Sequence, residues 1–210
     1  MKKEFDEALC KKYPKIFRDR HAPMTHTAMC WGFDIGDGWY NIIDTMCNNM
    51  QWHIYQSRQQ RARSLRYNRA LKRALNGDVR ALEMYFTFKK DAVEPDEYAK
   101  KSAAQILSKT EPQYRDVPEA CPQIIASQVK EKYGTLRFYY YGGDDYCHGV
   151  ESMAESMSAK TCEDCGNTGK LLAQGWHRTL CETHAKEQGY DWDEEDSDES
   201  DIEDENKISK

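Results

Sequence analysis

Apolar side chains recur at helical spacing directly after a glycine-rich stretch near the start of the chain. In "GDGWYNIIDTMCNNM" one face of a helix would collect Trp39, Ile42, Ile43, Met46, Cys47 and Met50. Spacings of three and four residues place such side chains on one side of an α-helix. Asp37 precedes them, and aspartate is a residue type that accepts hydrogen bonds from the free N–H groups of a first turn. The pattern predicts a buried helix capped by Asp37.

A second apolar stretch begins at Pro122 and also fits a helix. Proline suits the first turn of a helix, and Gly134 suits the position just past its end. Between them Ile125, Val129 and Tyr133 fit one helical face. We therefore expect a helix from Pro122 to about Tyr133.

Strict alternation replaces the helical period in "LRFYYY". Successive side chains of a strand point to opposite faces, so the pattern predicts a strand with two distinct faces. One face would hold Leu136, Phe138 and Tyr140, and the other would hold Arg137, Tyr139 and Tyr141. The following segment, "GVESMAESMSAK", predicts a helix with Val150, Met153 and Met157 on its apolar face.

The segment 51–120 has a different character, being rich in helix formers and poor in large apolar residues. Its apolar stripe is thin and consists of Leu65, Leu71, Leu75 and Leu82. Gly77 is expected to end one helix and Asp78 to begin the next. We interpret 51–120 as a mostly helical insertion in a more compact core.

Together these patterns predict an α+β fold in which a small sheet packs with helices. The expected parts are an α+β core of residues 1–50 and 121–157, the basic helical insertion 51–120, a zinc-binding module over 158–190 and an acidic tail over 191–210.

Charge is distributed unevenly along the chain. Residues 191–206 hold eleven acidic side chains and no basic one. Without the segment from residue 191 onward, 28 basic and 25 acidic residues remain, so the net charge changes from −6 to about +3. Like charges repel and the tail has almost nothing apolar to bury, which predicts a disordered tail.

No membrane partner is expected. The chain has no apolar run of about 18 residues, the length that a membrane span requires. The N-terminal "MKKEFDEALCKKYPKIF" has charged residues where a signal peptide would be apolar. A cytoplasmic location follows, and in that compartment eight cysteines are expected as thiols, some of them metal-bound, and not as a disulfide framework.

Two short pairs of candidate metal ligands stand near the C-terminus. Cys162 and Cys165 form a C-x2-C pair, and Cys181 and His184 form a C-x2-H pair, with fifteen residues between the two pairs. Three thiolates and one imidazole are a common tetrahedral set for structural zinc. The alternative is that these cysteines are ordinary buried thiols, and His177 is a competing candidate for the fourth ligand.

The order of elements around these pairs resembles a treble clef. Gly166 suits a tight turn after the first pair, a hairpin around Gly175 would follow, and a short helix would carry the second pair. Residues three apart share a helix face, so Cys181 and His184 can bind one ion. Four protein ligands leave no open position, so one structural Zn²⁺ per chain is expected.

A dense basic segment is the second candidate site. In the predicted insertion, 23 residues contain Arg58, Arg61, Arg63, Arg66, Arg69, Lys72, Arg73 and Arg80. Such density can neutralise several phosphates and give salt-dependent binding to nucleic acid. Tyr55 and Tyr67 are candidates for stacking on bases. The alternatives are a protein partner, pairing with the acidic tail, or a solvated face.

Four segments resemble a group of uncharacterised proteins encoded by tailed bacteriophages and prophages. They are "GDGWYNIIDTMC", "QVKEKYGTLRFYYYGG", "MAESMSAKTCEDCG" and "GWHRTLCETHA". The resemblance covers roughly residues 13–50 and 121–188. It implies a phage accessory protein in the cytoplasm of the bacterial host, and it implies no activity.

Three functions follow from these features as hypotheses. The first is a zinc-stabilised, non-enzymatic protein that binds nucleic acid through the basic segment. The second is an inhibitor or modulator of a host protein, such as a defence or transcription factor. The third is a nuclease, which has less support because no catalytic motif is recognisable and because Asp34, Asp37 and Asp44 do not match a calcium loop. The oligomeric state stays open.

Overall fold

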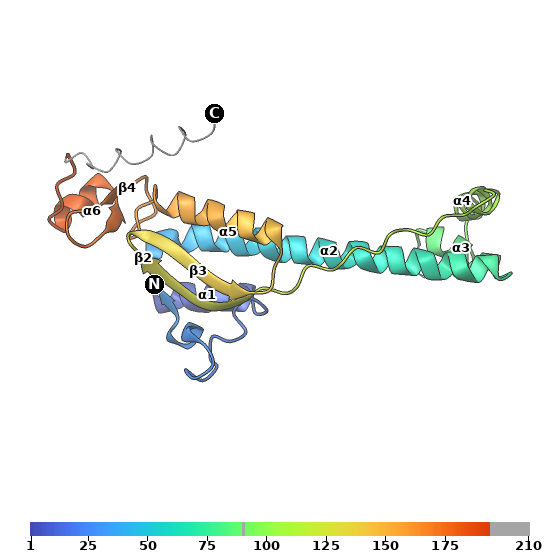
Figure 1. Ribbon diagram of the computed structural model, residues 1–210, viewed down its shortest axis with the longest axis horizontal. Coiled ribbons are helices and arrows are strands. Elements are labelled where there is room, and N and C mark those ends of the chain that lie inside the picture. Colours follow the sequence, from blue (N-terminus) through green and yellow to red (C-terminus); the bar gives the residue numbers. More distant parts are fainter. Residues whose placement is uncertain (90, 194–210) are drawn as a thin grey trace, which may run out of the picture. The chain divides into compact units, whose positions relative to one another are not determined.

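The computed structural model describes residues 1–89 and 91–193 and has an α+β fold. Over those residues the helices are α1 (Lys3–Lys12), α2 (Tyr40–Leu75), α3 (Val79–Phe86), α4 (Glu97–Leu107), α5 (Asp145–Ser158) and α6 (Glu182–Glu187). Two 3₁₀ turns, η1 (Ala28–Trp31) and η2 (Asp37–Trp39), precede α2. The small sheet and packed helices confirm the predicted fold class (Figure 1).

The chain divides into two compact units. The first comprises residues 1–52 and the described part of 122–210, and the second comprises residues 53–121. The first part of α2 belongs to one unit and the rest to the other, and each unit has buried apolar residues of its own.

The sheet of the first unit is three-stranded and mixed. The short strand β1 (Phe33–Asp34) pairs in parallel with β2 (Ile125–Lys132), and β2 pairs antiparallel with β3 (Thr135–Tyr141). Figure 1 shows β2 and β3 as two long adjacent arrows. Phe17 lies against Phe33 and Phe138, with ring centroids 5.0 Å and 6.3 Å away, and so joins the N-terminal segment to the sheet.

The prediction of a helix from Pro122 to Tyr133 is wrong, because most of this segment forms strand β2 (Ile125–Lys132). A β-bulge between Ala126 and Gln128 adds one residue to the strand. The bulge brings Ala126 and Val129, both fully buried, onto the same face although they are three residues apart. That spacing imitates a helical period. A two-residue turn at Tyr133 and Gly134, with φ of 53° and 75°, connects β2 to β3.

The alternation predicted for "LRFYYY" is confirmed in β3. Leu136 and Phe138 are buried, whereas Tyr139 and Tyr141 on the other face are exposed.

The predicted buried face of the first long helix is also confirmed. Its members are all less than 10 % exposed: Trp39, Ile42, Ile43, Met46, Cys47 and Met50. The expected capping by Asp37 is wrong, since α2 begins only at Tyr40 and the Asp37 carboxylate accepts the N–H of Lys2 at 2.7 Å. The 3₁₀ turn of residues 37–39 therefore separates Asp37 from the first turn of α2.

Helix α5 buries a face that differs from the predicted one. The buried residues are Cys147, Val150, Ala154 and Ser158, whereas Met153 and Met157 are about half exposed. Ser158 takes part in the contact with the sheet, because its hydroxyl accepts the N–H of Leu136 at 2.8 Å.

The second unit has a small core formed by the second part of α2 with α3 and α4. Its buried residues are Tyr67, Ala70, Leu71, Ala74, Leu82 and Ala103. Asp78 caps α3 by accepting the N–H of Ala81 at 3.3 Å, as predicted. Leu65 and Leu75 of the predicted stripe are 41 % and 48 % exposed, so alanines and Tyr67 take the place expected for leucines.

Candidate metal centre

The four predicted ligands come together at one point. Cys162 and Cys165 lie in the turn that follows α5, Cys181 is the N-cap residue of α6, and His184 lies within α6. One ligand atom of each residue lies within 4.8 Å of the others. The group is therefore close enough to hold a metal ion.

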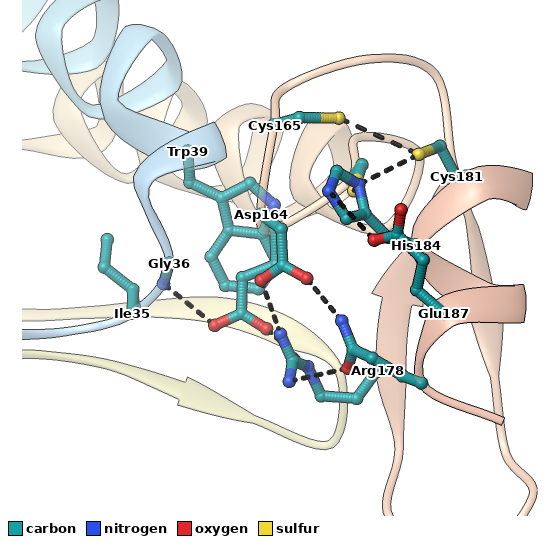
Figure 2. A network of polar contacts seen from close by, with 12 residues as sticks. Ile35, Gly36, Trp39, Asp164, Cys165, Arg178, Cys181, His184 and Glu187 are labelled. Atoms are coloured by element: carbon teal, nitrogen blue, oxygen red, sulfur yellow. Dashed lines mark hydrogen bonds and ion pairs between the residues drawn. The ribbon is translucent and has the colours of Figure 1, made fainter. Parts of the chain in front are cut away.

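The distances between these ligand atoms agree with a tetrahedral arrangement. Metal–sulfur bonds of about 2.3 Å and metal–nitrogen bonds of about 2.0–2.1 Å give sulfur–sulfur distances of about 3.8 Å and sulfur–nitrogen distances of about 3.5 Å. The Sγ atoms of Cys165 and Cys181 are 3.8 Å apart. His184 Nδ1 lies 3.5 Å from Cys162 Sγ and 3.2 Å from Cys181 Sγ. The four atoms are therefore close enough for one ion to bind them, and Figure 2 labels Cys165, Cys181 and His184 of this group.

Backbone hydrogen bonds fix the turn that carries the first pair. The N–H of Cys162 donates to the carbonyl of Asn167 at 2.7 Å, and the N–H of Gly166 donates to the carbonyl of Cys162 at 2.9 Å. Gly166 has a φ of +79°, a left-handed conformation that glycine adopts without strain. The predicted tight turn is present.

A hairpin connects the two ligand pairs. Strand β4 (Lys170–Leu172) pairs antiparallel with β5 (Arg178–Leu180), and Lys170 lies opposite Leu180. Cys181 directly follows β5, so the hairpin returns the chain to the first pair. Leu172, Leu180 and Ala185 are buried beside the two buried cysteines and form a small apolar cluster.

The N-terminus of α6 favours the thiolate form of Cys181. The pKa of this thiol is lowered to about 7, first by a hydrogen bond from the backbone N–H of His184. Desolvation raises the pKa of the Cys165 thiol to about 11, and hydrogen bonds with the other cysteines add to the rise. A metal ion would stabilise both thiolates, because the thiolate is the form that binds metals.

His184, and not His177, is the histidine of the cluster. Its Nδ1 faces the sulfurs, while its Nε2 lies 3.9 Å from a carboxylate oxygen of Glu187. The ring of His177 instead lies beside the ring of Tyr133, with 6.0 Å between centroids. Of the other cysteines, Cys10 and Cys30 are partly exposed, and the remaining three, Cys47, Cys121 and Cys147, are buried.

The glycine-rich segment before α2 binds directly to the turn of the first ligand pair, which sequence reasoning missed. The N–H of Gly36 donates to Glu163 Oε1 at 2.9 Å, and the N–H of Gly38 donates to the carbonyl of Glu163 at 2.7 Å. The indole N–H of Trp39 donates to the carbonyl of Thr161 at 2.8 Å. Residues 36–39 thus hold the backbone on both sides of Cys162.

This contact needs glycine at its centre. A Cβ atom on Gly38 would lie 2.2 Å from the carbonyl oxygen of Cys162 and 2.4 Å from the nitrogen of Gly166. Both neighbours are backbone atoms and cannot rotate away. The repeated glycine in "GDG" was the available signal, since glycine often marks a close approach of two backbones.

A buried ion pair also contacts the turn of the first ligand pair, and its arginine, Arg178, is labelled in Figure 2. Glu163 is 5 % exposed, and its Oε2 lies 2.9 Å from Nε of Arg178. Arg178 also contacts Asp164 at 2.9 Å, and Gln188 donates to the same aspartate at 2.6 Å. Burial raises the pKa of the Glu163 carboxyl, and the positive charge of Arg178 opposes that rise.

Beyond α6 the chain contacts the β4–β5 hairpin. Asp191 and Gln174 exchange two hydrogen bonds of 2.7 Å, and the ammonium group of Lys170 lies 5.1 Å from the ring centre of Trp192. Asp191 and Trp192 of the predicted tail therefore contact the hairpin. The rest of the predicted disordered tail, 194–210, lies outside the described residues.

The predicted basic residues lie in the second unit, along α2. Arg58, Arg63, Arg66, Arg69, Lys72 and Arg73 are exposed, and Arg61 is partly buried. Arg61 donates to the carbonyl of Pro118 at 2.8 Å, and Arg73 pairs with Asp78. Tyr67 is only 4 % exposed, so its proposed stacking on bases is wrong, whereas Tyr55 is 51 % exposed.

Asp37 and Asp44 do not form a cation site, because each is paired with a lysine. Asp37 lies 3.1 Å from the ammonium group of Lys2, and Asp44 lies 2.7 Å from that of Lys12.

No protein-family model, no curated protein and no solved structure matches the chain. Within residues 1–89 and 91–193, no helix is both long and apolar enough to cross a membrane.

Proposed function

We propose that this chain is a zinc-stabilised, non-enzymatic binding protein that contacts nucleic acid through the basic face of α2. The metal would be one structural zinc ion per chain, held by Cys162, Cys165, Cys181 and His184.

The donor set supports zinc. Thiolate and imidazole ligands at tetrahedral distances suit Zn²⁺, and four protein ligands leave no position for a substrate or a reactive water. The turn, the hairpin β4–β5 and helix α6 follow one another in the order of a treble clef. We assign the module to that class on this order.

The observation that carries nucleic-acid binding is that six of the seven Lys and Arg side chains of α2 lie on one side of the helix, Arg63 being the exception. At about 100° per residue, a single arc of about 140° holds Arg58, Arg61, Arg66, Arg69, Lys72 and Arg73, which we call the basic stripe. The buried residues Tyr67, Ala70, Leu71 and Ala74 lie on the opposite side. A regular row of cations on one solvent-facing surface matches a row of phosphates.

Few acids neutralise the basic stripe. Residues 53–121 hold 14 basic and 9 acidic side chains, which gives a net charge of +5. Within the described part of the chain, Asp78 is the only carboxylate in ion-pair contact with a stripe residue. Arg58, Arg69 and Lys72 are exposed and pair with no carboxylate of residues 1–89 and 91–193, so phosphates can reach them.

The resemblance to tailed-phage proteins supports a role as a phage accessory protein in the bacterial host. Two of the segments that carry it, "GDGW" and "KTCEDCG", contact each other at Gly36, Gly38 and Glu163. The resemblance therefore involves two segments that are hydrogen-bonded to each other.

Native mass spectrometry and a binding titration test the two parts of the proposal. We expect one zinc ion per chain, its loss in Cys181→Ser, and its retention in Cys30→Ser, where the cysteine lies outside the cluster. Absence of zinc, or retention in Cys181→Ser, would contradict the metal assignment.

Salt dependence tests the nucleic-acid part. Binding of a labelled oligonucleotide should weaken steeply between about 50 and 200 mM salt. The triple variant Arg58→Gln, Arg69→Gln, Lys72→Gln should lower the slope of log K against log salt by about 2–3. The matched control Lys11→Gln, Lys15→Gln, Lys109→Gln removes equal charge from exposed positions outside α2 and the slope should change little.

A complex that forms equally well in both triple variants would contradict the basic stripe as the site. If the wild-type chain binds no nucleic acid and instead retains one stoichiometric bacterial protein after nuclease treatment, the host-protein hypothesis takes its place.

A further inference from the structure

A hollow in the second unit borders the basic stripe. Its volume is about 480 Å³. Arg63 and Arg66 of α2 line one part, and Phe88 and Tyr98 line another. The rest is formed by the end of α3 and the residues after it, Met84 to Thr87. This volume lies within the range of sites that bind small organic groups.

Two aromatic rings in this hollow are unusually exposed. Phe88 is 81 % exposed and Tyr98 is 59 % exposed, and their ring centroids are 5.4 Å apart. Neither ring belongs to the buried cluster of this unit, which contains Tyr67 and packs against Tyr85 and Phe86. A solvent-facing aromatic pair is a suitable platform for another planar ring.

Two guanidinium groups next to this pair have no carboxylate partner within the described residues. Arg66 donates from Nε to the carbonyl of Ala62 at 3.3 Å, which leaves its other N–H groups free, and Arg63 makes no ion pair there. Arginine presents five donors in a planar fork that fits phosphate.

The acidic residues beside Tyr98 in the sequence are already engaged. The Asp96 carboxylate accepts the N–H of Ala99 at 2.8 Å, and Glu97 pairs with Lys100 at 2.9 Å. Glu94 pairs with Arg80 at 2.9 Å. Repulsion of an anion in the hollow is reduced because each of these charges has a partner.

We propose that this hollow binds one unpaired nucleotide of a single-stranded nucleic acid. The base stacks on Phe88 and Tyr98, and Arg63 and Arg66 bind the adjoining phosphates. Arg66 belongs to the basic stripe as well, so the strand continues from the hollow along α2. This inference rests on the proposed function and specifies its ligand.

Stacking selects single strands over duplexes. In a duplex the faces of each base are covered by its neighbours, whereas an unpaired base can lie on an aromatic ring. The phosphate contacts of the stripe do not make this distinction, because both kinds of nucleic acid carry phosphates. The preference for single strands should therefore depend on the rings and not on the stripe.

The test compares binding of one oligonucleotide sequence as a single strand and as a duplex, by fluorescence anisotropy with the full-length chain at fixed salt. In Phe88→Leu, Tyr98→Leu the affinity for the single strand should fall roughly tenfold or more, since stacking contributes that much per base. Duplex affinity should change less than about twofold, because its bases are not available. The control Tyr114→Leu removes a ring that is 52 % exposed in the same unit and should change neither affinity.

A conservative variant separates stacking from folding. Phe88→Tyr, Tyr98→Phe keeps both rings and should retain single-strand affinity, while circular dichroism should show equal helix content in all variants. Equal losses for single strand and duplex, or no loss at all, would overturn the inference. If the inference fails but the stripe variant Arg58→Gln, Arg69→Gln, Lys72→Gln loses affinity for both single strand and duplex, the proposed function still stands. If the wild-type chain binds neither form, the proposed function and this inference both fail.

Discussion

At the scale of single residues, Gly38 joins two parts of the sequence that have no obvious connection. Its N–H donates to the carbonyl of Glu163, and its α-carbon faces the carbonyl of Cys162. A side chain at this position would collide with the backbone of the metal ligand turn. The residue thus links the start of α2 to the geometry of the candidate metal centre.

Gly38→Ala should weaken zinc binding and lower stability. The added Cβ would lie 2.2 Å from a backbone oxygen, so the ligand turn must shift. We expect a loss of about 1–3 kcal/mol in unfolding free energy and at least a tenfold loss in zinc affinity, measured by competition with a chelator. The matched control is Gly149→Ala in α5, where nothing lies within 4 Å of the new Cβ and a small gain in stability is expected.

Zinc affinity should fall as the pH is lowered from 8 to about 6. The pKa of Cys165 is raised to about 11, so zinc binding displaces its proton over this whole range. The pKa of Cys181 is lowered to about 7, so this thiol adds a further proton as the pH falls below neutral, and His184, whose pKa is raised by its hydrogen bond with Cys181, adds another. Each displaced proton changes the affinity about tenfold per pH unit, and the slope should steepen below pH 7. A pH-independent affinity would contradict thiolate ligation.

The clustering of the four candidate ligands could be predicted from the sequence, but the contacts that hold their turn in place could not. Ligand pairs are local, because two residues between Cys162 and Cys165 are enough to indicate a shared ion. The hydrogen bond from Gly36 to Glu163 spans 127 positions along the chain. No periodicity or spacing rule reports a contact between such distant segments, so Asp37 was interpreted as a helix cap instead.

At the scale of elements, the ion pair of Glu163 and Arg178 connects the ligand turn to strand β5. Glu163 is almost fully buried, and removing its partner would leave an uncompensated charge. Arg178→Ala should therefore cost about 3 kcal/mol in unfolding free energy at saturating zinc. Adding Glu163→Gln should recover part of that loss, because the neutral amide needs no counterion.

Urea unfolding of the two single variants and the double variant gives the coupling energy, which we expect to be about 1–3 kcal/mol. Lys186→Ala breaks an exposed pair with Glu182 on α6 and should cost less than about 0.5 kcal/mol. Additive effects at positions 163 and 178 would contradict a structural role for the pair.

Strand β2 shows how an element can be mispredicted from spacing alone. The strand β3 alternates strictly and was predicted correctly. In β2 the bulge between Ala126 and Gln128 breaks the alternation, so the buried residues occur at a spacing that also fits a helix. A bulge depends on the pairing partner, and the pairing partner is not visible in a local pattern.

At the scale of the whole molecule, the two units differ in what stabilises them. The unit of residues 53–121 has its own apolar cluster around Leu71 and Leu82 and contains none of the four proposed ligands. The small module around Cys162 and Cys181 has a cluster of only a few apolar residues. A bound zinc ion would supply about 10 kcal/mol or more of folding free energy to such a module.

Removal of zinc should therefore loosen one unit selectively, and hydrogen exchange can show this. On addition of a strong chelator, the amides of Cys162 and Gly166 should lose protection because their turn is fixed by the ligands. Gly36 and Gly38 should follow, since both donate to Glu163.

The amides of α3 and α4 should keep their protection, because their contacts do not involve the metal site. Cys181→Ser should give the unprotected pattern before any chelator is added, and Cys30→Ser should behave as the wild-type chain. Loss of protection throughout residues 53–121 would show that the metal stabilises the entire chain. Unchanged protection at Gly38 would show that residues 36–39 contact the ligand turn even without the metal. We expect loss of protection only around the candidate metal centre, because Gly36, Gly38 and Trp39 donate their hydrogen bonds to the turn that carries Cys162.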